Sequence, residues 1–319
     1  MDVHTRDLRY FVAVAEELHF TRAARSLFIS QSALSKQIAQ LERALRTTLF
    51  VREGRRIALT PAGAELLPRA KAIVGQWGDA ERAISRASRE AENLLTIGFS
   101  AAPGNGLLSD AMEILSEAHP DVAFRMRRAE WTEEAGGVVS GHADVDFRWV
   151  PNGWTPDSYC QRVLYDDPVV VALWADHPLA GRESISFAEL GDERLLVLPE
   201  GSGPARETGF GPPDEERETR ELFTHVVTTV DETMEAIEAK LGVCLVMVSF
   251  AIAYERPTVR PVLVEDIPPR QYVVSWRADD QRPILTDFID SCSAAAGAFA
   301  ARTGRGIAAR QADGSLQPA

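Results

Sequence analysis

Residues 18–63 read LHFTRAARSLFISQSALSKQIAQLERALRTTLFVREGRRIALTPAG, and this stretch decides the fold of the N-terminal part of the chain. We expect a short helix with Thr21 as its N-cap, then a turn at 28–31 and a further helix capped by Ser30 or Ser32. The further helix carries an apolar stripe with helical spacing, formed by Leu34, Ile38, Leu41 and Leu45. Two helices joined by a tight turn are typical of a helix-turn-helix.

The flanks of this stretch complete the unit. Another amphipathic helix precedes it, on the apolar residues Leu8, Phe11, Val12, Ala15 and Leu18. After the helices, two strand-like segments at 49–52 and 56–59 enclose a turn at 53–55. The pattern as a whole predicts a winged helix-turn-helix.

The outward face of the helix after the turn begins with short or flexible hydrogen-bonding side chains, which reach base edges when a helix enters the DNA major groove. Residues 18–60 hold eight Lys and Arg against two Asp and Glu, in a chain whose net charge is −13. A helix-turn-helix alone also occurs in proteins that never touch DNA, but the local positive charge favours phosphate contact. We expect DNA contacts from Thr21, Ser30, Gln31, Ser32, Ser35, Lys36, Arg52, Arg55 and Arg56.

Four sequence motifs are similar to the N-terminal domain of LysR-type transcriptional regulators: FVAVAEELHFTRAA, SQSALSKQI, LE..L with LF.R, and LTPAG. The similarity is strong over about the first 65 residues and weaker through most of the remainder. It implies a transcriptional regulator with operator DNA, a small-molecule effector and RNA polymerase as partners. One position departs from the family: Arg46 stands where Gly is usual, and Gly would allow a left-handed helix C-cap.

A long helix follows the wing. Thr60 and Pro61 form a favourable helix start, and Pro68 should kink the first turns. Apolar residues then repeat at spacings of 4 and 3: Leu66, Ala70, Ile73, Trp77, Ala80, Ile84, Ala87 and Ala91. Such a seam of about 30 residues, or about 45 Å, favours pairing with a second copy over packing on its own domain. The resemblance implies the same, so Ile73, Trp77 and Ile84 are expected to form a dimer interface.

Charge and composition separate the two parts of the chain. Residues 1–90 hold 15 basic and 10 acidic side chains, a net charge of +5, so the remainder carries −18. No apolar run of 18 residues and no signal-peptide pattern occurs, and we expect a cytoplasmic protein without a membrane partner. Cys160, Cys244 and Cys292 are far apart, which fits a reducing compartment. A redox role for one of them stays open, and no spacing suggests a metal site.

From Leu94 onward, strands alternate with helices, which predicts parallel sheets covered by helices. Strands are expected at 94–100, 122–128, 145–150, 168–175, 194–198, 243–248 and 272–276, and helices at 107–120, 132–140, 231–240 and 283–301. The length suits two α/β lobes. The S-x-L, G-x-x-D-V and DHPLA segments resemble the effector-binding domain of the same regulators, which implies a two-lobed fold like that of periplasmic binding proteins. Lys240 and Met247 replace a Gly and a Pro usual in that family.

A ligand in such a fold lies beyond the carboxyl ends of the parallel strands. Arg148 on an apolar strand is suited to pair with a carboxylate, or alternatively forms an ion pair with Asp144, Asp146 or Glu130. Trp131 and Trp149 are either cavity walls or core residues. We expect effector contacts from Ser100, Ala101, Trp131, Arg148, Ser202 and Thr229, with the loop 201–203 as a second wall, and an anionic effector.

The fold class expected is therefore α/β multidomain. The parts are a winged helix-turn-helix at 1–60, a linker helix at 61–91, an effector-binding domain at 92–302 and a disordered tail at 303–319. Lobe I covers about 92–165 and 268–302, and lobe II about 166–267. No enzyme motif, catalytic residue or cofactor fingerprint is found. We expect a homodimeric or homotetrameric regulator; the alternatives are a binding protein or enzyme with an oligomerising N-terminal domain, and a DNA-binding protein without a ligand.

Overall fold

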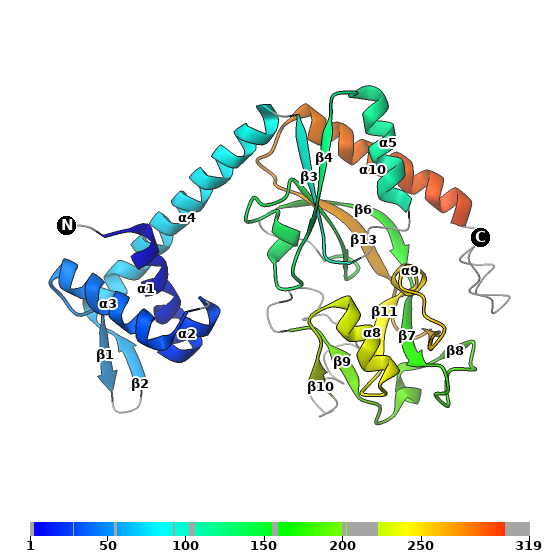
Figure 1. The fold of residues 1–319 in the computed structure, drawn as a ribbon, viewed down its shortest axis with the longest axis horizontal. Helices are drawn as coiled ribbons and strands as arrows, with labels where there is room; N and C mark the ends of the chain where they lie inside the picture. Colours follow the sequence, from blue (N-terminus) through cyan, green and yellow to red (C-terminus); the bar gives the residue numbers. More distant parts are fainter. Residues whose placement is uncertain are drawn as a thin grey trace. The chain divides into compact units, whose positions relative to one another are not determined.

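The computed structural model describes residues 3–27, 29–53, 56–91, 93–101, 106–154, 159–199, 202 and 223–303. The chain divides into two compact units, Met1–Ala87 and Ser88–Ala319. We call them the winged unit and the effector unit (Figure 1). In the described part of the chain, no helix is both long and apolar enough to span a bilayer.

The winged unit has the predicted order of elements: α1 (Thr5–Glu17), α2 (Phe20–Ser26), α3 (Gln31–Leu45), β1 (Phe50–Glu53), β2 (Arg56–Leu59) and all but the last residues of α4 (Pro61–Ala91). The two strands form an antiparallel hairpin. The predicted apolar stripes meet in one core, which includes the fully buried Phe11, Ala23 and Leu34. Leu18 was wrongly assigned to the first stripe: it is the left-handed C-cap of α1 and is 46% exposed. Helical periodicity therefore identified the core of this unit.

The LTPAG segment joins the hairpin to α4. The Thr60 hydroxyl accepts the Gly63 N–H at 3.1 Å and donates to the Thr48 carbonyl at 2.7 Å, so Thr60 caps α4 as predicted. Gly63 lies so close to the Leu49 carbonyl that a Cβ would overlap it. The cap and the glycine together set the direction in which α4 leaves the hairpin, and the helix then continues through Pro68.

The left-handed C-cap of α3 is present although the residue is not glycine. Arg46 has φ 54° and ψ 34°, and its N–H reaches the carbonyls of Glu42 and Arg43. A side chain in this region costs about 1–2 kcal/mol. Lys240, the other basic residue at a family glycine position, also has a positive φ of 59°.

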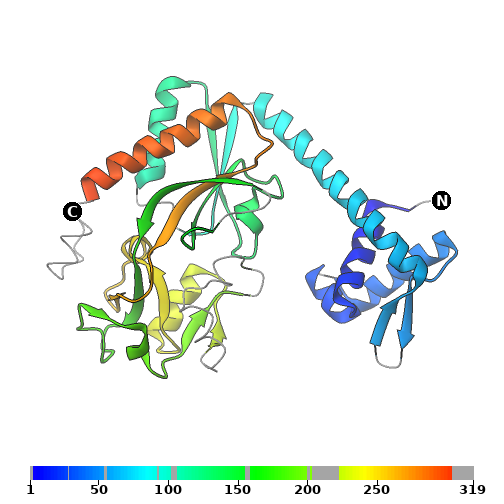
Figure 2. The ribbon, with the colours of Figure 1, turned by 180° about the vertical axis from the view of Figure 1, so that it is seen from behind.

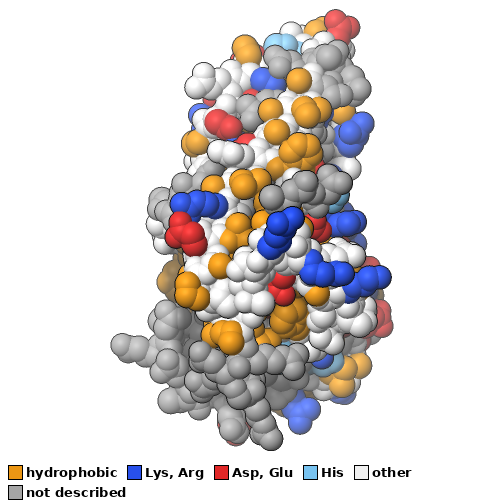
Figure 3. Space-filling model, turned by 90° about the vertical axis from the view of Figure 1, so that its left-hand side faces the viewer, with side chains coloured by type: hydrophobic (Ala, Val, Ile, Leu, Met, Phe, Trp, Pro, Cys, Tyr) orange, Lys and Arg blue, Asp and Glu red, His pale blue; other side chains and the backbone are white. Residues whose placement is uncertain are grey.

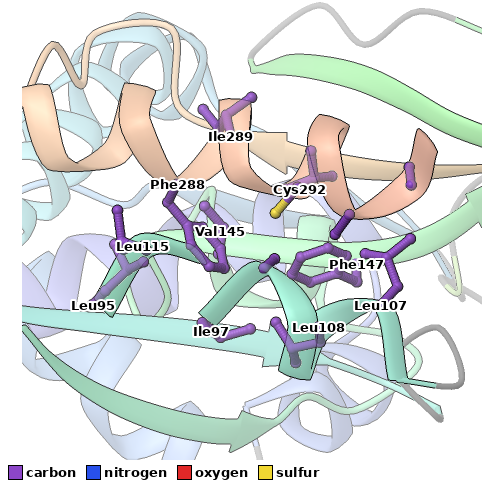
Figure 4. Close-up of a cluster of buried hydrophobic side chains, with 14 of the residues drawn as sticks. Leu95, Ile97, Leu107, Leu108, Leu115, Val145, Phe147, Phe288, Ile289 and Cys292 are labelled. Carbon is purple, nitrogen blue, oxygen red and sulfur yellow. The ribbon is translucent and has the colours of Figure 1, made fainter. Parts of the chain in front are cut away.

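Lobe I of the effector unit is a five-stranded sheet in the order β4-β3-β5-β13-β6. Its elements are β3 (Leu94–Phe99), α5 (Leu107–Ala118), β4 (Ala123–Arg128), η2 (Glu134–Gly137), β5 (Val145–Val150), β6 (Cys160–Asp167), β13 (Arg270–Trp276) and α10 (Pro283–Thr303). Helices α5 and α10 lie side by side over the sheet (Figures 1 and 2). Their apolar side chains meet those of β3 and β5 in one core, where Ile97, Phe147 and Phe288 are buried (Figure 4).

Lobe II has a four-stranded sheet in the order β11-β7-β12-β8 and a two-stranded sheet of β9 and β10. Its elements are β7 (Val169–Trp174), β8 (Ser184–Ile185), η3 (Phe187–Leu190), β9 (Leu195–Val197), β10 (Phe223–Val226), α8 (Val230–Glu238), β11 (Cys244–Met247), α9 (Val248–Ala253) and β12 (Val259–Val264). Along β7, Val169, Val171 and Leu173 face one core, whereas Val170 and Ala172 face another. Both faces of this sheet are therefore buried.

The sheets differ from the predicted all-parallel arrangement. Strand β3 pairs in parallel with β4 and β5, but β13 pairs antiparallel with both β5 and β6. In lobe II, β7 is antiparallel to β11 and β12. Strands β6, β8, β10 and β12 and helix α9 were not predicted. Strands β6 and β13 carry the chain between the lobes, and a strand that returns from another lobe need not follow the parallel rule for local βαβ units.

The helix predicted at 132–140 is also wrong. The structure has only a short 3-10 helix, Glu134–Gly137, because the glycines at its end adopt positive φ angles of 55° at Gly136 and 92° at Gly137. At the C-terminus, α10 extends to Thr303. The predicted tail beyond that residue lies outside the described residues.

Candidate functional site

The N-terminal half of α3 presents a polar surface. The Ser30 hydroxyl accepts the Ala33 N–H at 3.2 Å, which settles the choice of cap between Ser30 and Ser32. Gln31, Ser32 and Lys36 are exposed and Ser35 is half-buried. The Gln31 amide donates to the Ser35 hydroxyl at 2.8 Å, and the hydroxyls of Ser30 and Ser32 lie 3.1 Å apart. These side chains can exchange such exposed contacts for hydrogen bonds to base edges.

Thr21 is not the N-cap of α2. The ring nitrogen Nδ1 of His19 accepts the N–H groups of Thr21 at 3.2 Å and Arg22 at 3.4 Å, so the helix begins at Phe20. Histidine is not among the usual capping residues, which explains why the sequence pointed to the threonine. Thr21 is exposed on α2, and its contact with DNA stays a prediction.

The hairpin is held against α3 by a residue that the sequence reasoning missed. The carboxylate oxygen Oε1 of Glu42 accepts the N–H groups of Leu49 at 2.7 Å and Phe50 at 3.2 Å. Glu42 is one of two acids in the basic window 18–60, and that exception was the available signal. Arg52 and Arg56 lie on the two strands, whereas Arg55 and the side chains of the other two arginines lie outside the described residues.

Basic side chains of the winged unit are exposed at Arg22, Arg25, Lys36, Arg43 and Arg46. Arg22 forms an ion pair with Glu17 at 2.8 Å. Figure 3 shows one face of the molecule on which Lys and Arg side chains gather. Such a surface can neutralise phosphates.

Helix α4 carries an apolar stripe that begins in the core and ends in solvent. Ala70 is buried in the core of the winged unit, and Leu66 is partly buried against it. Beyond them, Ile73, Trp77 and Ile84 are 45%, 53% and 70% exposed. The first part of the predicted seam thus belongs to the winged unit, and the rest is available to a partner.

A cavity of about 380 Å³ lies between lobes I and II of the effector unit. Lobe I contributes Ser100, Ala101, the segment around Trp131, strand β5, Trp154 and Tyr159. Lobe II contributes Leu196, Leu198, Ser202, Thr233, Phe250 and strand β11. A cavity of this size is typical of small-molecule sites.

The structure brings together five of the six residues expected to contact an effector: Ser100, Ala101, Trp131, Arg148 and Ser202. The sixth, Thr229, does not line this cavity. Its hydroxyl accepts the Glu232 N–H at 3.1 Å as the N-cap of α8. Of the loop 201–203, only Ser202 is described.

Arg148 is engaged in an ion pair. Its guanidinium contacts the Asp146 carboxylate at 2.5 Å and lies over the ring of Tyr159, 5.8 Å from the centroid. Burial raises the pKa of Asp146, and the contact with Arg148 opposes that shift. Of the two readings of Arg148, the structure therefore shows the ion pair, with Asp146 as partner, in a cavity wall.

Gly136 allows this pair to form. A Cβ on Gly136 would overlap the Asp146 carboxylate. Beside it, Glu133 is held by Arg127 at 2.9 Å and His142 at 3.2 Å. Burial of Glu133 raises its pKa, but these contacts outweigh it, so the pKa is lowered. The carboxylates of Glu133 and Asp146, which both line the cavity, therefore have partners.

Asp167 links the cavity wall of lobe I to lobe II. The Trp149 indole N–H donates to its carboxylate at 2.8 Å, and the Ser249 hydroxyl and N–H, at the start of α9, donate to the same carboxylate. Asp167 is 1% exposed, and burial raises its pKa to about 6 against the opposing hydrogen bonds. Trp149 is therefore a wall residue whose position depends on both lobes, which the sequence did not indicate.

The three cysteines are unpaired. Burial raises the pKa of Cys244 to about 12 and also raises that of Cys292. A thiol must ionise to react, so neither fits a redox sensor. The described residues include no group of His, Cys, Asp or Glu that could hold a metal ion.

Comparison with known proteins agrees with both halves of this description. Residues 5–64 match the family described as "Bacterial regulatory helix-turn-helix protein, lysR family", and residues 88–297 match "LysR substrate binding domain". The uncharacterized regulator YnfL of Escherichia coli is 32% identical, over 90% of this chain and 97% of its own. The Hca operon activator HcaR of the same organism is 33% identical, over 89% and 95%. The structure of a Corynebacterium glutamicum OxyR mutant has a TM-score of 0.51 and 27% identity, covering 95% of this chain and 96% of its own.

Proposed function

The chain belongs to the LysR family of DNA-binding transcriptional regulators, and from that premise we propose that a small molecule in the interlobe cavity changes its binding to operator DNA. The coupling is a difference in effector affinity between two arrangements of the protein. A cytoplasmic location is part of the proposal, because operator DNA lies there. RNA polymerase is the partner through which bound regulator changes transcription.

The observation that carries the proposal is the exposed polar start of α3. Gln31, Ser32 and Lys36 lie in the first two turns of α3, within a unit of net charge +5 over residues 1–90. The effector unit carries −18, so DNA is attracted by one unit and repelled by the other. This asymmetry favours the α3 face as the DNA contact.

A gel-shift titration against genomic fragments at several salt concentrations tests the proposal. Affinity for the operator fragment should fall steeply with salt, because phosphate contacts release counterions. A binding protein or enzyme whose N-terminal unit only oligomerises would give no salt-dependent shift. A DNA-binding protein without a ligand would shift DNA but show no response to any metabolite in a thermal-shift screen.

Base and phosphate contacts are separated by two variants. Gln31→Ala should weaken the operator complex by about 1–3 kcal/mol and relax the sequence preference. Arg55→Ala should weaken all DNA sequences alike and lower the salt slope by about one. Equal effects of both variants on operator and random DNA would contradict the assignment.

We propose a homodimer or homotetramer that is assembled through the exposed part of the α4 stripe. Ile73, Trp77 and Ile84 recur at one face of the helix and are exposed, which supports a helix pair. The proposed parts are 1–60 for DNA binding, 61–91 for dimerisation and 92–302 for the effector, with lobe I at about 92–165 and 268–302 and lobe II at about 166–267. Thr21, Ser30, Ser35, Arg52 and Arg56 remain proposed DNA contacts, whereas Thr229, which does not line the cavity, is not proposed as an effector contact.

A further inference from the structure

The cavity offers a ligand mainly ring and aliphatic surface. Trp131, Trp149, Trp154 and Phe250 line it together with the apolar residues of β11. Two of the indoles have already used their only donor: the Trp131 N–H on the Ser100 carbonyl at 3.3 Å and the Trp149 N–H on Asp167. What these side chains can offer is therefore ring surface, which suits an aromatic ligand.

The cation of the cavity is not free for an anionic ligand. The Arg148 guanidinium contacts Asp146, whose side chain is 2% exposed, at 2.5 Å. A ligand carboxylate that drew Arg148 away would leave a buried, unpaired carboxylate, and the loss of one partner from a buried pair is strongly destabilising. The pair therefore behaves as a neutral unit with both a donor and an acceptor.

The charged side chain of the described cavity lining that lacks an ion-pair partner is negative. Glu130 lines the cavity, is exposed, and has no ion-pair partner within the described ranges. Of the other two carboxylates in the described lining, Glu133 is paired with Arg127 and Asp146 with Arg148, so Glu130 is the unbalanced charge. The effector half of the chain adds a long-range negative field. A ligand anion would therefore be repelled both by the carboxylate in the cavity lining and by the net negative charge of the effector unit.

Among the described residues, a buried hydroxyl of the cavity is available to the ligand. The Ser202 hydroxyl is buried, with 6% of the residue exposed, and no hydrogen-bond partner for it occurs among the residues that are described. A hydroxyl can donate or accept, so it can satisfy an amide, a hydroxyl or an ammonium group. An unpaired buried hydroxyl is costly, and a polar ligand group would remove that cost.

From these four observations we propose that the effector is an aromatic compound whose polar group is uncharged or positively charged. Its ring packs among the tryptophans, its polar group bonds to Ser202 and the Arg148–Asp146 pair, and Glu130 attracts that group when it is positively charged. The inference rests on the proposed function, since it names the ligand class of the same cavity. It replaces the anionic effector expected from the sequence, for which an unpaired Arg148 was the motivation.

Three probes test the charge of the ligand's polar group directly, because they share the same phenyl ring and the same chain length. They are 3-phenylpropanamide, 3-phenylpropylammonium and 3-phenylpropanoate. Titration calorimetry on the full chain should show that the amide and the ammonium bind about tenfold more tightly than the carboxylate. The proposal is overturned if the carboxylate binds most tightly of the three probes. It is also overturned if none of the three probes binds. Salt-dependent operator binding in a parallel gel shift shows whether the proposed function survives that result.

Two variants sharpen the test. Glu130→Gln should lower affinity for the ammonium probe about twofold to fivefold, as expected for an exposed ion pair, and leave the amide unchanged. Trp131→Leu should weaken both probes. The melting temperature of each variant without ligand, compared with that of the parent chain, shows whether the fold is intact. Equal losses for ammonium and amide in Glu130→Gln, or full binding by Trp131→Leu, contradict the proposed contacts.

Discussion

The proposed base contacts come from residues 30–36 at the start of one helix, whereas the cavity draws its lining from positions between Ser100 and Phe250 on both lobes. The first is positioned by local bonds, such as the Ser30 cap and the Gln31–Ser35 contact. The second depends on long-range contacts, such as Trp149 with Asp167 and Asp167 with Ser249. A local surface can act as a rigid contact, while a surface shared by two lobes can respond to their arrangement.

The largest effect that tests this comparison is on stability. Phe288 is fully buried and packs against Phe124 and Phe147 at ring distances of 6.2 and 6.4 Å. Phe288→Ala should destabilise the effector unit by about 3–5 kcal/mol and leave the winged unit unchanged. Scanning calorimetry measures both transitions, with Phe288→Leu as the milder control. A common fall of both transitions would show that the two units unfold together.

The next effect concerns assembly. Trp77→Glu with Ile84→Glu places two charges on the exposed stripe of α4, where Trp77 is 53% and Ile84 70% exposed. The double variant should be monomeric and bind the operator about a hundredfold more weakly, because one half-site alone gives up much of the specific affinity. Analytical ultracentrifugation and gel shifts measure the two changes.

A control for this variant adds the same charges beside the stripe. Ala72→Glu with Ala83→Glu changes two exposed residues of the same helix and should keep assembly and operator affinity. Should the stripe variant stay dimeric, or the control variant dissociate, then the interface lies elsewhere.

The third prediction concerns pH. The folded pKa of Asp167 is raised from 3.8 to about 6, so the folded state holds this proton more tightly than the unfolded chain. Its contribution to stability is therefore lost as pH rises from about 4 to 6, by on the order of 2 kcal/mol. Urea unfolding of the effector unit at pH 4 to 7 should show that loss, and Asp167→Asn should reduce it. Parallel curves for the parent and the variant would exclude Asp167 as the cause.

The smallest effect is expected at Arg46 and Lys240, the two basic residues whose backbone adopts the left-handed conformation. Arg46 has no side-chain partner among the residues described, whereas Lys240 pairs with Asp176 at 2.7 Å and lies 5.9 Å from the centre of the Trp174 ring. Arg46→Gly should stabilise the winged unit by about 0.5–1 kcal/mol, because glycine adopts φ 54° without strain. Lys240→Gly should give less, since it also removes two favourable contacts. A larger gain at Lys240 in chemical denaturation would contradict this account.

The sequence alone determined what depends on short-range periodicity. Apolar spacing located α1, α3 and most strands, and Thr60 identified the start of α4, because helices and strands repeat over a few residues. The exposed polar start of α3 followed from the same periodicity. Five cavity residues were also predicted, since the carboxyl ends of parallel strands meet at one edge of a sheet.

Only the tertiary structure decided which partners those residues have. Neither the antiparallel return of β13 nor the pairing of Arg148 with Asp146 can be read from spacing, because a strand or an arginine has several possible neighbours in the sequence. Gly136 shows the reason most clearly: its missing side chain makes room for a carboxylate ten residues later in the chain. Periodicity reports which side of an element is buried, and packing alone selects what lies against it.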